Sequence, residues 1–138
     1  MIIRNMTIND YEKVYALWIN TSGMGLNDID DSKKGIAKYL TRNPSTCFVA
    51  DDDGEIKGVI MCGHDGRRGF IYHTAVAKDS RGIGIGRALV NHALDALKSE
   101  GIIKACLVAF TKNEPGNAFW EKLGFKVRED LYYRDIRL

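Results

Sequence analysis

Cysteine and proline are scarce in this chain of 138 residues, and both scarcities narrow the possible structures. The three cysteines, Cys47, Cys62 and Cys106, are odd in number and far apart, which argues against a disulfide framework. Each lies in an apolar run and is expected to be a small buried side chain in a reducing cytoplasm. No CxxC or HxxxH spacing occurs, so we expect no metal site. The two prolines, Pro44 and Pro115, each mark the boundary of an element.

Long apolar runs and a large net charge are also absent. No run of about 18 apolar residues occurs, so no segment is expected to span a membrane. The N-terminus lacks a charged region followed by a long apolar region, so we expect no secretion signal. The formal net charge of +2 is too small to predict a nucleic-acid partner. A hydrophobic content of 45%, together with the length, predicts one globular domain over residues 1–138, located in the cytoplasm.

The spacing of apolar residues predicts a mixed α+β fold. Thr7 and Asp10 resemble a capping box that opens the first helix, and Gly101 and Gly124 are placed to end later helices. The order of elements predicts a three-layer α/β/α arrangement, with a mostly antiparallel central sheet and one parallel crossover. We predict strands at residues 1–6, 47–50, 56–62, 70–77, 102–110, 125–127 and 131–138, and helices at residues 11–18, 31–40, 84–99 and 115–123.

A glycine-rich junction is the most informative part of the chain. Gly82, Gly84 and Gly86 alternate where a predicted strand gives way to an amphipathic helix. Glycines there let main-chain N–H groups converge on one point, and the positive end of the helix dipole aims at the same point. Arg81 and Arg87 flank the glycines with planar donors that suit phosphate. The junction therefore predicts a pyrophosphate-binding site.

Three interpretations of this junction compete. A dinucleotide-binding loop needs the spacing G-x-G-x-x-G, but Arg87 stands where the last glycine would fall when counted from Gly82. A P-loop needs G-x-x-x-x-G-K-(S/T), which the junction does not supply. A turn that binds nothing is disfavoured, because each of the three glycines costs stability that a purely structural turn need not lose.

Two motifs resemble the GNAT superfamily of N-acetyltransferases. Arg81-Gly82-Ile83-Gly84-Ile85-Gly86 matches the acetyl-CoA motif (R/Q)-x-x-G-x-(G/A) of that family. The segment at residues 113–125 resembles the family's N-x-x-A-x-x-(F/L)-Y-x-K-x-G-F pattern. With the predicted order of strands, the resemblance covers nearly the whole chain. The short length and the hairpin at residues 63–69 are similar to a small bacterial branch of uncertain substrate.

The resemblance implies acetyl-CoA as the co-substrate. In this family the strand before the glycine motif splays from its neighbour, and the pantetheine arm enters the gap. Here those strands are residues 70–77 and 102–110. The Val76 N–H would polarise the thioester carbonyl, and the amides that follow Arg81 would hold the pyrophosphate. The residues expected to bind the cofactor are Ala75, Val76, Ala77, Arg81, Gly82, Ile83, Gly84, Ile85, Gly86, Arg87, Asn113, Gly116 and Trp120.

The implied reaction is direct attack of an amine on the acetyl thioester. A free alkylamine, with a pKa of about 10.4, arrives protonated, so a side chain or a chain of waters must accept a proton. Family members often carry the base at the position of Tyr72, where tyrosine is a poor base. His73 is a second candidate, although strand alternation would turn it to the opposite face, and a half-buried structural histidine is the competing interpretation.

The proton donor to the leaving thiolate is also open. The family's usual tyrosine is replaced by Trp120, whose indole cannot supply a proton. Tyr132 or Tyr133 on a closing strand could take this role, although strand packing is the simpler explanation for both. A thiol with a pKa of roughly 8.5, by analogy with cysteine, does not strictly need an acid. The candidate catalytic groups are therefore Tyr72, His73, Tyr132 and the main chain of Val76.

The acceptor is expected to be a primary amine of a small molecule or peptide. The loop between the first two helices carries Asn27, Asp28, Asp30 and Asp31, whose carboxylates would suit a polyamine, an aminoglycoside or a peptide lysine; ordinary acids at a helix N-terminus are the simpler explanation. Because of Trp120, a non-catalytic acyl-CoA-binding sensor or partner protein is the alternative function. A nucleotide-binding module unrelated to CoA is a third. Family habit also suggests a homodimer formed through the closing strands.

Overall fold

The computed structural model describes residues 1–138, which divide into two units, Met1–Val108 and Ala109–Leu138. The first unit holds five strands and three α-helices, and the second holds one α-helix. Two short 3₁₀ helices, η1 (Ile8–Asp10) and η2 (Lys78–Ser80), lie in the first unit. None of the helices combines the length and the apolar character that crossing a membrane requires.

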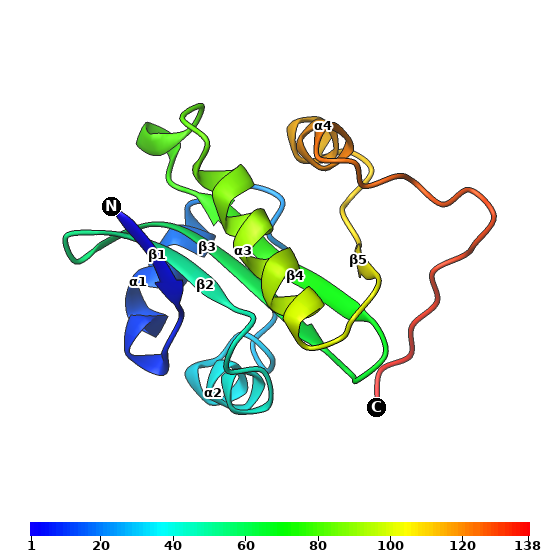
Figure 1. Ribbon diagram of the computed structural model, residues 1–138, viewed down its shortest axis with the longest axis horizontal. Coiled ribbons are helices and arrows are strands. Elements are labelled where there is room, and N and C mark those ends of the chain that lie inside the picture. Colours follow the sequence, from blue (N-terminus) through cyan, green and yellow to red (C-terminus); the bar gives the residue numbers. More distant parts are fainter. The chain divides into compact units, whose positions relative to one another are not determined.

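A five-stranded sheet organises the first unit (Figure 1). The neighbouring strands of β1 to β4 are antiparallel, and only β4 and β5 are parallel. A parallel pair needs a crossover connection, which α3 (Ile85–Ser99) supplies. The predicted mostly antiparallel sheet with one parallel crossover is therefore confirmed. In spatial order, the strands are β1 (Ile2–Asn5), β2 (Phe48–Asp52), β3 (Glu55–His64), β4 (Gly69–Val76) and β5 (Ala105–Leu107).

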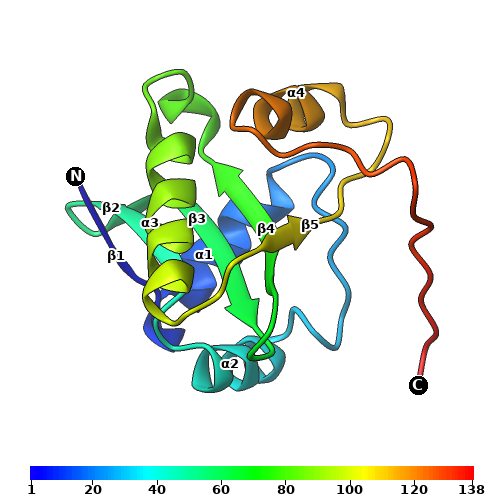
Figure 2. The same cartoon turned by 45° about the vertical axis from the view of Figure 1, so that its right-hand side comes forward.

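Two helices cover one face of this sheet. They are α1 (Tyr11–Ile19) and α2 (Lys33–Arg42), which lie on the side of the sheet away from α3 (Figures 1 and 2). Their inward residues, among them Val14 and Trp18, join Val59 and Met61 of β3 in the hydrophobic core. The 3.6-residue period of a helix places these apolar side chains on the face that meets the sheet. Their removal from water stabilises the packing of the helices on the sheet.

The helix α3 packs on the opposite face, over two glycines of the sheet. A Cβ atom on Gly58 would lie 2.9 Å from Cδ1 of Leu89, and one on Gly69 would lie 2.6 Å from Cδ1 of Leu97. The helix ends at Gly101 (φ 80°) in a Schellman motif, in which the next N–H donates to the Leu97 carbonyl at 3.0 Å. The predicted α/β/α layers and the C-terminal glycine cap are thus confirmed.

A β-bulge interrupts β4. Opposite Ile60 of β3, the strand β4 contains two residues, His73 and Thr74. The extra residue breaks the alternation of side chains, so that His73 contacts Trp18 of α1 while Tyr72 contacts α2. The expectation that His73 and Tyr72 occupy opposite faces is wrong, because it assumed a strand without a bulge.

The strand β5 is shorter than predicted. Only Ala105–Leu107 pairs with β4, whereas the prediction extended over residues 102–110. The apolar side chains of Ile103, Val108 and Phe110 are exposed instead of buried in a sheet. An apolar run in the sequence does not determine how many of its residues pair with the neighbouring strand, and here only three residues of β5 pair with β4.

The second unit is built around α4 (Glu114–Lys122). Asn113 caps the helix by accepting the Gly116 N–H at 3.1 Å. Gly124 (φ 96°) ends it in a second Schellman motif, with the Phe125 N–H donating to the Trp120 carbonyl at 3.0 Å. The helix predicted at residues 115–123 is confirmed.

The two predicted closing strands are absent. Residues 125–127 and 131–138 contain no strand, and the sheet order ends at β5. A strand needs hydrogen bonds to a neighbouring strand, which the apolar pattern of these residues does not itself provide. Between them, Arg128 donates from Nε to Asp130 at 2.9 Å within a turn.

Candidate functional site

The glycine-rich loop joins the end of β4 to the start of α3. Gly82 and Gly84 have φ angles of 80° and 92°, in the left-handed region that residues with a Cβ atom rarely adopt. A Cβ atom built on either residue would meet no atom within 4 Å. The glycines are therefore required by the main-chain conformation and not by crowding, and open space lies in front of them.

The N-terminus of α3 has no cap. Its N-cap residue is Gly84, which has no side chain to accept the first N–H groups. The first helical bond runs from the Ala88 N–H to the Gly84 carbonyl at 3.0 Å, so Ile85, Gly86 and Arg87 have no acceptor within the helix. No acidic side chain lies in the first turn to offset the helix dipole. A bound anion would satisfy these donors.

The last residue of β4 lies on an open edge of the sheet. The N–H of Ala77 donates to a carbonyl of β3 at 2.8 Å. Because successive residues face opposite edges, Ala75 also faces β3, and the N–H and carbonyl of Val76 face the other way. On that side β5 pairs only with Gly69–Ile71, so it does not reach Val76. There the Nε of Arg81 donates to the Val76 carbonyl at 3.1 Å, which ties the glycine loop to the strand.

His73 is paired with an acid from the loop before α2. Its Nε2 lies 2.8 Å from Oδ1 of Asp31, and the two side chains are 16% and 5% exposed. From the sequence, Asp31 is expected to be an acceptor-loop carboxylate or an ordinary acid at a helix N-terminus. The partners are 42 positions apart, so no local pattern signals the pair. The pairing of Asp31 is therefore the feature of the site that sequence reasoning missed.

Tyr72 lies beside His73, with 6.4 Å between their ring centroids. Its ring packs on Phe70 at 4.7 Å and meets Tyr39 of α2 at 5.9 Å. Tyr72 is 48% exposed, so the surface of this aromatic group is accessible. The bulge thus brings the two catalytic candidates of β4 to the same side of the sheet.

In the second unit, three of the residues predicted to bind the cofactor, Asn113, Gly116 and Trp120, contribute to the ends of α4. A Cβ atom on Gly116 would lie 2.5 Å from Nδ2 of Asn113, so the glycine makes room for the helix cap. Trp120 packs edge-on against Phe125 at 5.2 Å, which is the apolar contact that accompanies a Schellman motif. Tyr132 is 89% exposed. The roles of these residues in cofactor binding or proton transfer remain predictions.

The buried cysteines are poor candidates for chemistry. Burial raises the pKa of the Cys47 thiol and the pKa of the Cys62 thiol, each to about 12. Thiolate is the nucleophilic form, so both groups are unreactive at neutral pH. They act as small apolar side chains, as predicted for these two residues. The prediction that Cys106 is also buried is wrong: this residue lies on the short edge strand β5 and is exposed.

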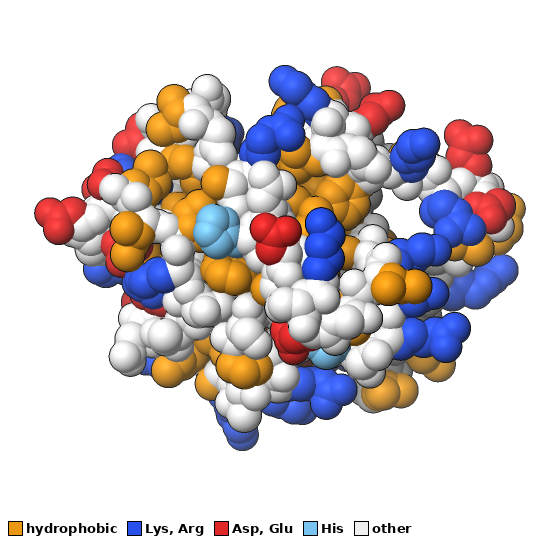
Figure 3. All heavy atoms as spheres, viewed as in Figure 1, with side chains coloured by type: hydrophobic (Ala, Val, Ile, Leu, Met, Phe, Trp, Pro, Cys, Tyr) orange, Lys and Arg blue, Asp and Glu red, His pale blue; other side chains and the backbone are white.

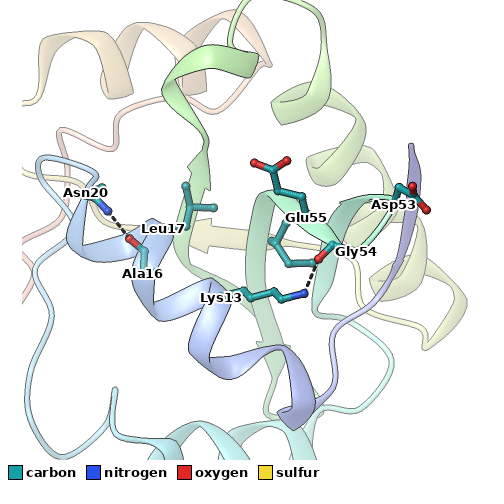
Figure 4. Close-up of a pocket in the computed structure, with 8 residues that line it drawn as sticks. Lys13, Ala16, Leu17, Asn20, Asp53, Gly54 and Glu55 are labelled. Atoms are coloured by element: carbon teal, nitrogen blue, oxygen red, sulfur yellow. Dashed lines mark hydrogen bonds between the residues drawn. The ribbon is translucent and has the colours of Figure 1, made fainter.

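A groove of about 670 Å³ lies between α1 and the β2–β3 hairpin (Figure 4). Three of its polar side chains already have partners. Lys13 donates to the Gly54 carbonyl, and Asn20 donates to the Ala16 carbonyl at 2.8 Å. Glu55 pairs with a lysine of its own strand at 2.9 Å. The groove contains none of the residues expected to bind the cofactor or to transfer a proton.

Charged side chains of both signs are scattered over the face of the molecule seen in Figure 3. The chain contains 20 lysine and arginine residues and 18 aspartate and glutamate residues, so neither sign dominates.

Comparisons with known proteins agree with this geometry. Residues 11–125 match the acetyltransferase (GNAT) family. An acetyltransferase of Sodalis glossinidius is 32% identical over 138 residues, which is 100% of this chain and 96% of the relative. Ard1 of Thermoplasma volcanium superposes with a TM-score of 0.82 at 22% identity, covering 92% of this chain and 83% of its own. The PaiA N-acetyltransferase of Thermoplasma acidophilum, solved with coenzyme A, gives a TM-score of 0.79 at 22% identity, with 92% and 90% covered.

Proposed function

The chain belongs to the GNAT family of acetyltransferases, and we propose that it transfers the acetyl group of acetyl-CoA to a primary amine of a small molecule or peptide. The amine attacks the thioester directly in a ternary complex. The observation that carries the proposal is the uncapped N-terminus of α3, which follows the glycine loop beside the open edge of β4. Donors for a pyrophosphate and a free main-chain edge for an extended arm thus occur on one continuous segment.

The pyrophosphate would bind to the amides between Gly82 and Arg87. These residues fit it because the loop is open in front of Gly82 and Gly84, and because the first three helical N–H groups have no acceptor in α3. The side chain of Arg87 is exposed at the same helix end and supplies a cationic donor. Arg81 binds the Val76 carbonyl through Nε, which leaves its terminal nitrogens to face a phosphate.

The thioester carbonyl would be polarised at Val76. Its N–H faces the edge that β5 leaves open, where the pantetheine amides would continue the hydrogen bonding of the sheet. A main-chain donor held by a strand is fixed before negative charge develops on the oxygen, and such preorganised donors stabilise transition states. The PaiA enzyme, which shares this fold, was solved in complex with coenzyme A, and this supports binding of the same cofactor here.

The acceptor would be a cationic amine such as a polyamine, an aminoglycoside or a peptide lysine. Asp28 and Asp30 of the α1–α2 loop are exposed, so their carboxylates are available to attract an ammonium group. Asp31 is not available in the same way, because its carboxylate is already paired with His73. The exposed ring of Tyr72 adds a face on which an alkylammonium group can rest.

Release of CoA thiol from acetyl-CoA tests this proposal. The assay would use spermidine, an aminoglycoside and a lysine-containing peptide as separate acceptors, with binding of CoA followed by calorimetry. Acceptor-dependent thiol release is expected with at least one amine. Saturable CoA binding without thiol release from any amine would favour the alternative, an acyl-CoA-binding sensor or partner protein. Preferential thermal stabilisation by ATP or NAD over acetyl-CoA would favour a nucleotide-binding module.

We further propose that the two units form one domain located in the cytoplasm and that the protein is a homodimer. The match of residues 11–125 to one family spans both units, and the three cysteines are free thiols. Residues 131–138 expose Leu131, Tyr133 and Ile136 without a sheet partner, and apolar side chains of this kind are usual at subunit contacts. Analytical ultracentrifugation should give the mass of a dimer, and a monomer at all concentrations would contradict the assembly.

A further inference from the structure

The pair His73–Asp31 connects the sheet to the α1–α2 loop. The Nε2 of His73 lies 2.8 Å from Oδ1 of Asp31. The rings of Trp18 and His73 pack in a T-shaped arrangement, with 5.1 Å between their centroids and 69° between their planes. Only 5% of the Asp31 side chain and 16% of the His73 side chain are exposed. The imidazole is therefore held in one orientation, with part of it accessible.

The second oxygen of Asp31 determines which nitrogen of His73 carries the proton. That oxygen, Oδ2, accepts the main-chain N–H of Asn27 at 2.8 Å. An ionised carboxylate only accepts, so its other oxygen must receive a proton from Nε2. In the neutral ring Nε2 then carries the hydrogen, and Nδ1 keeps its lone pair. No protein group bonds to Nδ1, so this nitrogen is the one able to take a proton from a ligand.

We propose that His73 accepts the proton of the acceptor amine at Nδ1, and that Asp31 is the positioning residue that keeps His73 in the competent tautomer. The proposal rests on the acetyl transfer proposed above. The ammonium group gives one proton to Nδ1, and the neutral amine attacks the carbonyl carbon. The C–N bond forms, the C–S bond breaks, and the second proton of the nitrogen goes to the departing sulfur. The imidazolium then releases its proton to water, which balances the reaction.

Few other titratable groups surround the imidazole. Tyr72 is on the same strand, Tyr39 is on α2, and Tyr11 of α1 donates its hydroxyl to the Asp31 carbonyl at 2.7 Å. Burial raises the pKa of Tyr11 and that of Tyr39, so both remain neutral at the pH values of an assay. The strand β3 presents only apolar side chains at this level. The carboxylate of Asp31 is thus the one charge that faces the ring.

Two substitutions of Asp31 separate a positioning role from a structural one. In Asp31→Asn, the main-chain N–H of Asn27 must donate to the side-chain oxygen of the new asparagine. The NH₂ group of that side chain then faces Nε2 of His73 and donates to it, so the ring proton must be on Nδ1. That tautomer cannot accept a proton from the amine. In Asp31→Ala, Nε2 loses its partner but either tautomer can form. A catalytic tautomer therefore predicts lower activity for Asn than for Ala, whereas a purely structural pair predicts the reverse.

The test combines histidine-ring NMR with thiol-release kinetics for the wild type, Asp31→Asn, Asp31→Ala and His73→Ala. His92→Ala, at an exposed position of α3, is the control. The three histidines should give separable ring signals, with that of His73 showing Nε2–H in the wild type and Nδ1–H in Asp31→Asn. We expect kcat to fall about 10²-fold or more in Asp31→Asn and His73→Ala, and about tenfold in Asp31→Ala, with spermidine, an aminoglycoside or a lysine peptide as acceptor.

The pH dependence supplies a second readout. Protonated imidazole cannot accept a proton, so kcat/KM of the wild type should fall on acidification, and this limb should disappear in His73→Ala. An Asp31→Asn variant that keeps Nε2–H, or is at least as active as Asp31→Ala, would overturn the proposal. If the wild type acetylated none of the amines, the proposed acetyl transfer would be refuted. If the wild type were active but Asp31→Asn were more active than Asp31→Ala, only the proposed role of His73 would be refuted.

Discussion

The Nε of Arg81 donates a hydrogen bond to the main-chain carbonyl of Val76 at 3.1 Å. This bond joins the loop that would hold a pyrophosphate to the strand end that would hold the thioester. Because the partners are five positions apart, the bond closes the turn between β4 and the glycines. The distance between the two ends of the proposed cofactor site is therefore set within one short segment of main chain.

Replacing Arg81 by alanine should weaken acetyl-CoA binding about tenfold. The substitution removes both a cationic donor near the phosphates and the bond to Val76, and a hydrogen bond to a charged group contributes about 1.5–3 kcal/mol. Stability should change little because Arg81 is exposed. Arg67→Ala, at an exposed position in the β3–β4 turn, is the matched control. Calorimetry showing equal affinities for the two variants would contradict a role of Arg81 in binding.

Replacing Gly58 by alanine should destabilise the first unit by about 1–3 kcal/mol. The new Cβ atom would lie 2.9 Å from Leu89 and 3.0 Å from Ile85, and also 3.3 Å from the main-chain oxygen of Ala75. Gly69→Ala should cost less, since it meets only the side chain of Leu97, whose end can rotate. Urea unfolding measures both. A Gly58→Ala variant as stable as the wild type would show that α3 can move away from β3.

The contact of Arg4 with Asp10 should make stability depend on pH in the acid range. Burial pushes the pKa of Asp10 up, but hydrogen bonds from Arg4 and the Thr7 N–H outweigh burial, so that the net pKa is lowered. Because the pKa of Asp10 is lower in the folded protein, its carboxylate stabilises the fold fully at pH values above the pKa of the unfolded chain, about 3.9. This stabilisation is lost as the pH falls through the pKa of the folded protein.

Asp10→Asn should remove this dependence and lower stability at pH 7 by about 1–3 kcal/mol. The comparison is between unfolding free energies at pH 7 and at pH 3, with Asp95→Asn on the exposed surface of α3 as the control. The difference between the two pH values should shrink only in Asp10→Asn. An unchanged difference would mean that the Arg4 contact does not hold the carboxylate in its charged form.

Gly116→Ala should weaken the start of α4. The added Cβ atom would lie 2.5 Å from Nδ2 of Asn113, so the side chain that caps the helix must move. Loss of an N-cap costs about 1 kcal/mol. Hydrogen exchange should therefore accelerate for the amides of the first turn of α4 while those of α3 keep their protection. Unchanged exchange in α4 would contradict the cap.

Much of the fold could be predicted because its boundaries are set by local chemistry. Gly101 and Gly124 end their helices through left-handed main-chain conformations that glycine adopts readily. The Asp-Gly pair at residues 53–54 turns β2 into β3, as expected of a hairpin. The glycine loop could be found for the same reason, since Gly82 and Gly84 are required by their own φ angles.

The remaining features depend on contacts between distant residues. The bulge at His73 and Thr74 is set by pairing with β3, and no property of the β4 sequence signals the extra residue. The pairing of Asp31 likewise depends on how the α1–α2 loop meets the sheet. The closing strands were wrongly predicted at residues 125–127 and 131–138, because an alternating apolar pattern was taken to imply a pairing partner.

Calorimetric titration of acetyl-CoA into Gly84→Val and Gly66→Val tests the central claim most directly. Both glycines are strained for a β-branched residue, with φ angles of 92° and 91°, and at both a Cβ atom would meet nothing within 4 Å. The two variants thus share a positive φ angle and open space but differ in location. Gly66→Val should bind acetyl-CoA as the wild type does, while Gly84→Val should lose binding severely because the side chain would block the approach of phosphate to the helix end. Equal affinity of the two variants would contradict the assignment of the glycine loop as the pyrophosphate site.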